Sequence, residues 1–267
     1  MSFRTFSLHQ LGWRPDYAQH LTLDDFEAGT PARVLAVHAA RLEVYASSGI
    51  RRVERPDHLA GADVAVGDWL MVGRESPSVR RRLPRRSLLE GLSADGAGRM
   101  AVANLDTLLV VLRGDDDLAV TRAARHVALA TDAGIEPLVL AMGTAARLPS
   151  PQLRAAPTIV ASAEGAGVLR QLASWLVPGH TLAIAGPSGS ATRGLIRSLT
   201  AGASPRASVG DDARVRVPGG LLATATGAWI VDLMVRRHGQ RVTSGGPCHA
   251  RRCGGAPAVA WMPLAHS

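Results

Sequence analysis

Apolar and polar residues alternate in short runs through the first third of the chain, and small or polar residues separate these runs. A period of two is typical of half-buried antiparallel strands, because successive side chains point to opposite faces of a sheet. We expect strands over residues 32–38, 41–46, 49–55, 69–72 and 79–83. Short strands this close together along a sequence favour a small β-barrel of the SH3 or OB type.

The pattern changes near residue 90, where continuous apolar runs replace the alternating ones. Such runs are typical of parallel strands buried on both faces. We expect strands over residues 107–112, 137–141, 158–160, 181–185, 220–223 and 229–233, and helices over 118–133, over 168–176 and in a segment that ends near 201. Alternation of strands and helices predicts a mostly parallel sheet with crossover helices.

The expected fold class is therefore α/β, an OB-like barrel followed by a domain with a mostly parallel sheet. We expect a leader over residues 1–30, the barrel over 31–89, the parallel-sheet domain over 90–233 and a short basic tail over 234–267. No apolar run is long enough to cross a membrane, and the start of the chain has no secretory pattern. We expect a soluble, cytoplasmic protein with no membrane partner.

Charge adds an expected partner to this picture. The formal net charge is +8, the pI is near 11.1, and all 30 of the Lys and Arg residues are arginine. Because a guanidinium binds phosphate through a planar fork, this excess predicts a polyanion such as nucleic acid. A basic surface without such a partner is the alternative.

Arginines gather along the predicted barrel and at its exit. The candidates for RNA contact are Arg51, Arg52, Arg80, Arg81, Arg82, Arg85 and Arg86. Neighbours along a strand point to opposite faces, so these side chains do not all share one surface. Arginine–phosphate contacts give affinity with little sequence readout. A solvated basic face is the alternative.

The most informative segment follows the apolar run 181–185. It passes from Gly186 to Arg193 through glycine and serine residues and leads into a helix, which is the context of a phosphate-binding loop. Against the pattern G-x-x-x-x-G-K-[ST], only Gly186 matches. Ala191 replaces the second glycine, Thr192 the lysine and Arg193 the magnesium ligand. One helical position is a rotation of about 100°, so Arg193 should not point where the lysine would point. A Gly/Ser-rich turn with no ligand is the alternative.

Three further segments resemble one known family. The sequence contains V-G-D-W at 66–69, L-P-R-R-S at 83–87 and A-N-L-D at 103–106, in that order. This set is similar to the motifs of the ribosome small-subunit-dependent GTPase A family, and the resemblance covers residues 30 to 233. It implies a circularly permuted P-loop GTPase-like domain after the barrel, with the base-recognition motif ahead of the phosphate loop. It also implies that the barrel contacts ribosomal RNA.

The resemblance assigns nucleotide-site positions, most of which depart from the family's residues. The matching positions are Gly186, Ser188, Gly189, Ser190, Ala191, Thr192 and Arg193 in the phosphate loop, Met142, Thr144 and Ala145 at the base-recognition motif N-K-x-D, Ser162 and Ala163 behind the guanine, and Thr224 and Gly227 at the motif D-T-P-G. The lysine, the guanine-binding aspartate and the magnesium-side aspartate are absent at these positions. Since hydrogen bonds to charged groups contribute about 1.5–3 kcal/mol each, we expect GTP or GDP with Mg²⁺ to bind weakly. We assign no catalytic residue.

The tail carries the two cysteines of the chain. Cys248, His249 and Cys253 lie where the family has a zinc subdomain with three cysteines and one histidine. Structural zinc takes four protein ligands, and only three are clustered here. We favour two free thiols in a remnant of this subdomain over a zinc site.

Three functions remain after these departures. The first is a pseudo-GTPase that binds the small ribosomal subunit or its rRNA with little or no GTP hydrolysis. The second is a residual GTPase in small-subunit assembly, in which Thr192 and Arg193 compensate for the lost residues. The third is a nucleotide pocket adapted to another small-molecule ligand or a different reaction, since Met142, Thr144 and Thr224 make it less polar than the family's pocket.

Overall fold

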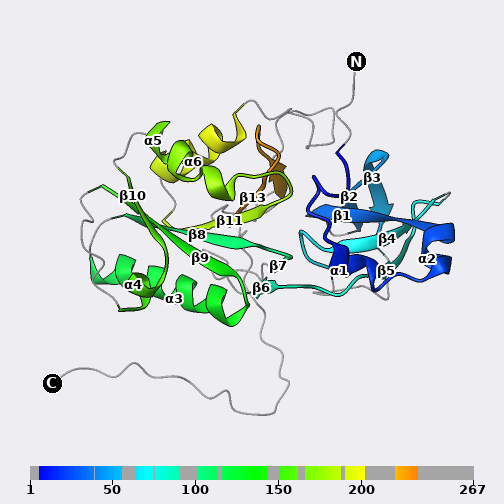
Figure 1. Ribbon diagram of the computed structural model, residues 1–267, viewed down its shortest axis with the longest axis horizontal. Helices are drawn as coiled ribbons and strands as arrows, with labels where there is room; N and C mark the ends of the chain where they lie inside the picture. Colours follow the sequence, from blue (N-terminus) through cyan, green and yellow to red (C-terminus); the bar gives the residue numbers. More distant parts are fainter. Residues whose placement is uncertain are drawn as a thin grey trace, which may run out of the picture. The chain divides into compact units, whose positions relative to one another are not determined.

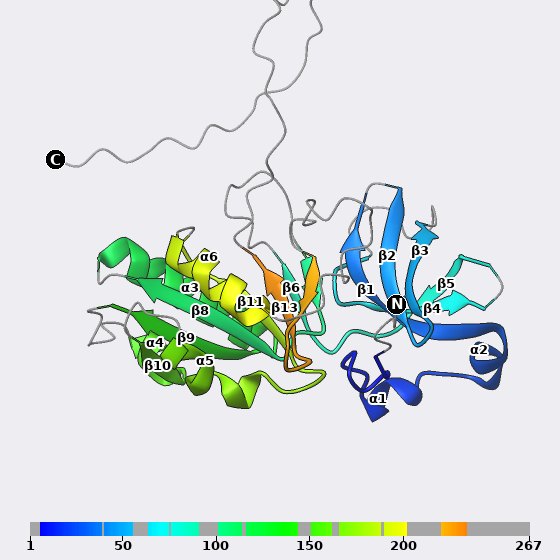
Figure 2. The same ribbon diagram turned by 90° about the horizontal axis from the view of Figure 1, so that it is seen from above.

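The computed structural model describes residues 6–38, 40–55, 64–74, 76–90, 101–113, 116–143, 151–161, 166–187, 190–201 and 220–233. These residues form an antiparallel barrel and an α/β sheet (Figures 1 and 2). The boundaries expected between leader, barrel, sheet domain and tail stay predictions.

Two short helices, α1 (Pro15–Ala18) and α2 (Leu23–Ala28), precede the first strand. Thr22 and Asp25 form a capping box at the start of α2, in which each side chain accepts a hydrogen bond from the other residue's backbone N–H. The sequence pattern did not reveal these helices, because each is too short to show a helical period.

Five antiparallel strands make the barrel, and all five were predicted. They are β1 (Gly29–Val37), β2 (Arg41–Ala46), β3 (Gly49–Glu54), β4 (Trp69–Gly73) and β5 (Val79–Arg82). The strand order is β3-β2-β1-β4-β5. Alternate residues of β1 and β2, such as Val34 and Val44, fill the interior. The hairpin of β6 (Leu88–Glu90) and β7 (Ala101–Ala103) follows the barrel.

The second sheet has six strands in the order β10-β9-β8-β11-β13-β12. They are β8 (Thr107–Arg113), β9 (Glu136–Met142), β10 (Thr158–Ala161), β11 (Thr181–Ala185), β12 (Leu221–Ala223) and β13 (Trp229–Asp232). All pairs are parallel except β12 with β13. The predicted α/β class and its mostly parallel sheet are confirmed.

Helices cover both faces of this sheet (Figure 1). One face holds α3 (Asp117–Asp132) and α4 (Pro151–Ala155), and the other holds α5 (Ala166–Gln171), a 3₁₀ turn (Ala173–Trp175) and α6 (Ser190–Thr200). Val127 of α3 belongs to one core cluster, and Val168 of α5 and Leu195 of α6 belong to the other.

The strand order reverses between β8 and β11. The chain moves from β8 outward to β9 and β10, then returns to β11 on the other side of β8. In open α/β sheets, ligands bind at such a switch point, outside the carboxyl ends of the strands. Gly186 follows β11 at this edge and Arg113 ends β8, so the topology points to the segment that the sequence analysis singled out.

Candidate functional site

Gly186 lets the chain turn sharply out of β11. Its φ of 153° lies in a region that disfavours side chains, and a Cβ there would lie 2.7 Å from the carbonyl oxygen of Val111. Glycine is therefore required for the close approach to β8. This much of a phosphate-binding loop is preserved.

Thr192, at the position matched to the lysine, is buried within the protein. Its Oγ1 donates a hydrogen bond of 3.1 Å to the carbonyl oxygen of Pro187. The hydroxyl therefore closes the loop from inside. Arg193, one position further along α6, is exposed to solvent, and its expected rotation away from the lysine position stays a prediction.

The base-recognition position ends β9. Met142 is buried and packs in the apolar cluster that includes Leu140 and Val168. Gly143 follows with a φ of 88° and donates its N–H to Ala161. A buried thioether offers no acceptor for guanine, so Met142 does not replace the amide of the family's motif.

The topology corrects the assignment of Thr224 and Gly227 to the magnesium-side motif. Residues 224–227 form the turn between the antiparallel strands β12 and β13, where Thr224 Oγ1 contacts the carbonyl oxygen of Ala228 at 3.0 Å. This turn precedes β13, whereas ligand-binding residues of parallel sheets follow their strands.

The carboxylate that follows the correct strand is Asp232, which the sequence analysis missed. It ends β13 next to Ile184 of β11, and it is partly exposed. The signal in the sequence was the apolar run Trp229–Val231 that leads directly into an aspartate. An aspartate therefore lies at the carboxyl edge of the parallel sheet, next to β11.

The other predicted site positions lie wholly or partly outside the described residues. For Ser190 and Ala191 only the backbone is described, as the first residues of α6. Ser188, Gly189, Thr144, Ala145, Ser162, Ala163, Cys248, His249 and Cys253 fall outside the described ranges. Among the described residues, no three His, Cys, Asp or Glu side chains form a cluster suited to a metal ion.

Most of the predicted RNA-binding arginines have partners within the protein. Arg51 donates to the carbonyl oxygen of Gly73 at 3.0 Å, and Arg52 donates to Glu43 at 3.4 Å. Arg81 donates to Asp25 at 2.6 Å. These contacts join barrel strands or hold α2 on the barrel. Arg80 and Arg82 have no ion pair with a described residue.

The three family motifs meet at one junction between the barrel and the six-stranded sheet. Asp68 of V-G-D-W is fully buried and accepts two hydrogen bonds from Arg85 of L-P-R-R-S, at 2.7 and 2.8 Å. Asn104 of A-N-L-D accepts from the backbone N–H of Arg86 at 2.9 Å and donates to the carbonyl oxygen of Gly67 at 3.0 Å. We call the contacts of these motifs the joint.

Asp106 connects the joint to the start of β11. It accepts hydrogen bonds from Arg14 at 2.5 Å, from Arg86 at 3.3 Å and from the backbone N–H of Thr181 at 2.9 Å. Burial opposes ionisation of this carboxyl group, but the Thr181 N–H, His180 and the two arginines outweigh it, so its pKa is lowered. Asp106 therefore stays charged and joins the leader, the motif L-P-R-R-S and β11.

No protein-family model matches the chain. It is 31% identical over 243 residues to the small ribosomal subunit biogenesis GTPase RsgA of Mesorhizobium japonicum, covering 85% of this chain and 70% of the relative. It is 33% identical over 141 residues to RsgA 2 of Vibrio vulnificus, covering 52% of this chain and 40% of the relative. The chain belongs to the RsgA family.

A solved structure agrees in fold. The crystal structure of YjeQ from Thermotoga maritima matches with a TM-score of 0.52 and 19% identity, over 76% of this chain and 73% of the other. At that identity the match supports the OB-like barrel and the permuted GTPase-like fold. In this member of the RsgA family, the motifs that carry the resemblance build the joint, and the departures lie at the positions matched to the family's nucleotide-binding motifs.

The leader of this RsgA-family chain is part of the same junction. Arg33 of β1 is fully buried and donates to the carbonyl oxygen of Leu11 at 2.5 Å and to Thr181 Oγ1 at 2.7 Å. Burial lowers the pKa of its guanidinium to about 10, so it remains charged at neutral pH. Trp229 Nε1 donates to the carbonyl oxygen of Gln10 at 2.7 Å. The leader backbone thus binds both β1 and β13.

An arrangement that resembles a catalytic triad lies beside Asp106. His180 Nε2 is 2.9 Å from Thr107 Oγ1, and its Nδ1 is 4.0 Å from Asp106. Thr107, however, is fully buried, and burial lowers the pKa of His180. A nucleophile must reach its substrate, so we assign these residues to the joint and not to catalysis.

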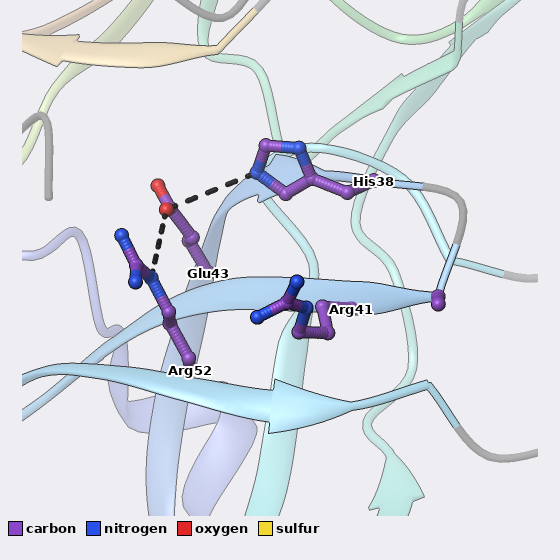
Figure 3. Close-up of a pocket in the computed structure, with 5 residues that line it drawn as sticks. His38, Arg41, Glu43 and Arg52 are labelled. Carbon is purple, nitrogen blue, oxygen red and sulfur yellow. Dashed lines mark hydrogen bonds and ion pairs between the residues drawn. The ribbon is translucent and has the colours of Figure 1, made fainter. Parts of the chain in front are cut away.

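A hollow of ≈ 440 Å³ opens on the barrel, lined by His38, Ala40, Arg41, Glu43 and Arg52. Figure 3 shows the Glu43 carboxylate between His38 and Arg52, with distances of 3.9 and 3.4 Å. The acid neutralises part of the positive charge, so this hollow is less suited to anions than its two arginines suggest. No helix in the described part of the chain is long and apolar enough to span a membrane.

Proposed function

We propose that this chain is a pseudo-GTPase of the RsgA family that binds the small ribosomal subunit or its rRNA with little or no GTP hydrolysis. Its relatives are named small ribosomal subunit biogenesis GTPases, and the net charge of +8 suits a polyanionic partner. The joint also supports binding, because its side-chain hydrogen bonds keep the barrel and the six-stranded sheet together as one surface.

The observation that carries the proposal is the buried hydroxyl of Thr192. A phosphate loop needs a cation at this position to neutralise the β and γ phosphates of the nucleotide. Thr192 supplies no charge, and its Oγ1 is engaged with Pro187. The residues present therefore do not fit a magnesium–nucleotide complex as the family's residues would, and we derive no hydrolytic step.

The positions matched to the base-recognition motif also support weak nucleotide binding. Loss of the aspartate that accepts hydrogen bonds from guanine removes about 1.5–3 kcal/mol per charged hydrogen bond. Met142 packs inward and offers guanine no contact in return. Together with the missing lysine, a loss on the order of 5 kcal/mol corresponds to a several-thousand-fold weaker site, since about 1.4 kcal/mol is tenfold.

Asp232 favours a second candidate, a residual GTPase. A carboxylate at the end of β13, beside β11, is placed to bind a metal ion near a phosphate. This single group does not replace a lysine, because it adds negative charge to a site that must accept phosphates. The first proposal therefore stands ahead of the second.

Calorimetric titration with GTP, GDP and a non-hydrolysable GTP analogue, in the presence of Mg²⁺, tests the proposal. We expect no binding in the micromolar range, and no phosphate release above that of buffer. Micromolar, guanine-specific binding would favour the residual GTPase.

A restored variant provides the control. We expect the triple substitution Ala191→Gly, Thr192→Lys and Arg193→Ser to raise GTP affinity at least about tenfold, because it returns the cation and the hydroxyl to the loop. Co-sedimentation with isolated small ribosomal subunits at increasing salt tests separately whether the chain binds the ribosome.

A further inference from the structure

The two faces of the six-stranded sheet differ in charge. The chain contains no Asp or Glu between Ala166 and Ala201, the stretch that forms α5, the 3₁₀ turn and α6. The same stretch carries three exposed arginines, Arg170, Arg193 and Arg197. On the opposite face, by contrast, acidic residues flank the arginines of α3: Asp116 and Asp117 at its start, and Asp132 at its end.

The three arginines belong to one layer. Arg193 and Arg197 are one helical turn apart on α6, so their side chains lie on the same side of that helix. Leu195, Ile196 and Leu199 are buried against the sheet. Arg170 lies on α5, whose Val168 and Leu172 pack into the same core cluster. Figures 1 and 2 show both helices on this face.

These guanidinium groups are available to an external partner. None of the three makes a hydrogen bond or ion pair with a residue that the structure describes. In the barrel, Arg81 and Arg85 are paired with Asp25 and Asp68, whereas Arg80 and Arg82 have no ion pair with a described residue. A paired arginine must give up part of an existing interaction to bind phosphate, whereas an unpaired one does not.

We propose that the α5–α6 face, defined by Arg170, Arg193 and Arg197, binds the phosphate backbone of structured RNA. This inference rests on the proposed function, in which the chain binds rRNA, and it names the surface that makes this contact. Phosphate is favoured over a protein partner because protein interfaces carry large apolar anchors at their centres. Neither α5 nor α6 has an exposed large hydrophobic side chain among the described residues.

The position of Arg193 links this face to the altered nucleotide site. It stands where the phosphate loop pattern has a magnesium-binding hydroxyl, in the first turn of α6. The start of a helix favours anions, because unpaired N–H groups point outward there. Replacement of a metal ligand by a cation thus adds a phosphate contact at the surface.

Two variants of the full chain, matched in charge, test the proposal. The first replaces Arg170, Arg193 and Arg197 by Gln. The second replaces Arg122, Arg125 and Arg154, three exposed arginines of α3 and α4, by Gln. Binding of a fluorescein-labelled RNA hairpin is measured by anisotropy between about 50 and 200 mM salt. Circular dichroism confirms that both variants are folded.

We expect the first variant to bind about 10–100-fold more weakly, with a salt slope reduced by about 2–3, because each lost phosphate contact removes about 0.7–0.9 from the slope. The second variant should keep most of the affinity. Equal losses in both variants, or a larger loss in the second, would overturn the assignment to α5–α6.

If polyglutamate displaced the RNA at equal charge concentration, the face would belong to an acidic protein, and the proposal would be wrong. If the unmodified chain bound no RNA, the proposed function itself would be wrong in assigning RNA binding to this protein.

Discussion

At the scale of single residues, substitution of the two glycines Gly186 and Gly194 by alanine should change stability in opposite directions. A Cβ at Gly186 would lie 2.7 Å from the Val111 carbonyl oxygen, while a Cβ at Gly194, inside α6, would meet nothing within 4 Å. We expect Gly186→Ala to lower the free energy of unfolding by about 1–3 kcal/mol, through backbone strain. We expect Gly194→Ala to raise it by about 0.5–1 kcal/mol, since alanine favours helix.

Urea unfolding followed by circular dichroism measures both changes. Similar effects of the two substitutions would show that the close approach of Gly186 to β8 does not determine the stability of this turn.

The buried Asp68–Arg85 pair allows the contribution of the joint to stability to be tested. Asp68 is fully buried, so Asp68→Ala removes the acceptor of two hydrogen bonds from Arg85 and of one from the Ala65 N–H. We expect a loss of about 3–5 kcal/mol in unfolding free energy, as is usual when one member of a buried pair is removed.

Asp16→Ala is the matched control, because Asp16 pairs with Arg86 at 3.5 Å on the surface. Its cost should stay within about 1 kcal/mol. Chemical denaturation of both variants distinguishes the two, and a small effect at Asp68 would contradict the role given to the joint.

Residue identity alone was not enough to find Asp232. Thr224–Gly227 fits the spacing of the family's motif, and the apolar run before Asp232 does not by itself outweigh that fit. What decides between them is pairing: β13 lies parallel to β11, and β12 does not contact β11. Strand pairing is a long-range property, so a pattern within one segment cannot reveal it.

At the scale of elements, α2 is held on the barrel by charge. The Arg81 guanidinium, followed by the Thr22 backbone N–H, holds the pKa of Asp25 well below its usual value of 3.8. Because the folded pKa is lowered, this stabilisation is complete above pH 4 and is lost as pH falls below it. We expect the stability of the chain to decrease with acid in that range.

Asp25→Asn should flatten this decrease, because the amide does not titrate. Thermal unfolding between pH 2.5 and 6 measures the effect in both proteins. An identical acid dependence in the variant would mean that other carboxyl groups dominate.

The sequence predicted the strands better than the short helices. The five barrel strands are short runs that turn residues separate, and the apolar runs of β8, β9 and β11 are long enough to recognise. The helix α2 has only six residues, although Thr22 and Asp25 formed a visible capping signal. The predicted helix 168–176 is α5 and a separate 3₁₀ turn, because Leu172 turns inward to the core between them.

At the scale of the whole molecule, the leader binds parts that lie far apart in the sequence. Trp229 Nε1 donates to Gln10, and Phe6 contacts both Tyr45 and Trp229 with ring centroids 5.4 and 5.5 Å apart. We expect Trp229→Phe to lower the free energy of unfolding by about 1–3 kcal/mol, because it leaves the Gln10 carbonyl oxygen without a donor.

Trp175→Phe is the control, since Trp175 is only partly buried beside the other core cluster. Differential scanning calorimetry compares the two variants. Equal shifts in melting temperature would contradict a specific role for the Gln10 contact.

The contact between Gln10 and Trp229 spans 219 positions of the chain. During translation Gln10 is synthesised long before β11 and β13, so its contact with Trp229 forms only after the residues between them have been made. Arg33 cannot be buried until Thr181 has been made, which means that the nascent barrel keeps this charge in water. Contacts of such long range also slow folding. The contact of the barrel residue Arg33 with Thr181 therefore forms only after the 148 positions that separate the two residues have been synthesised.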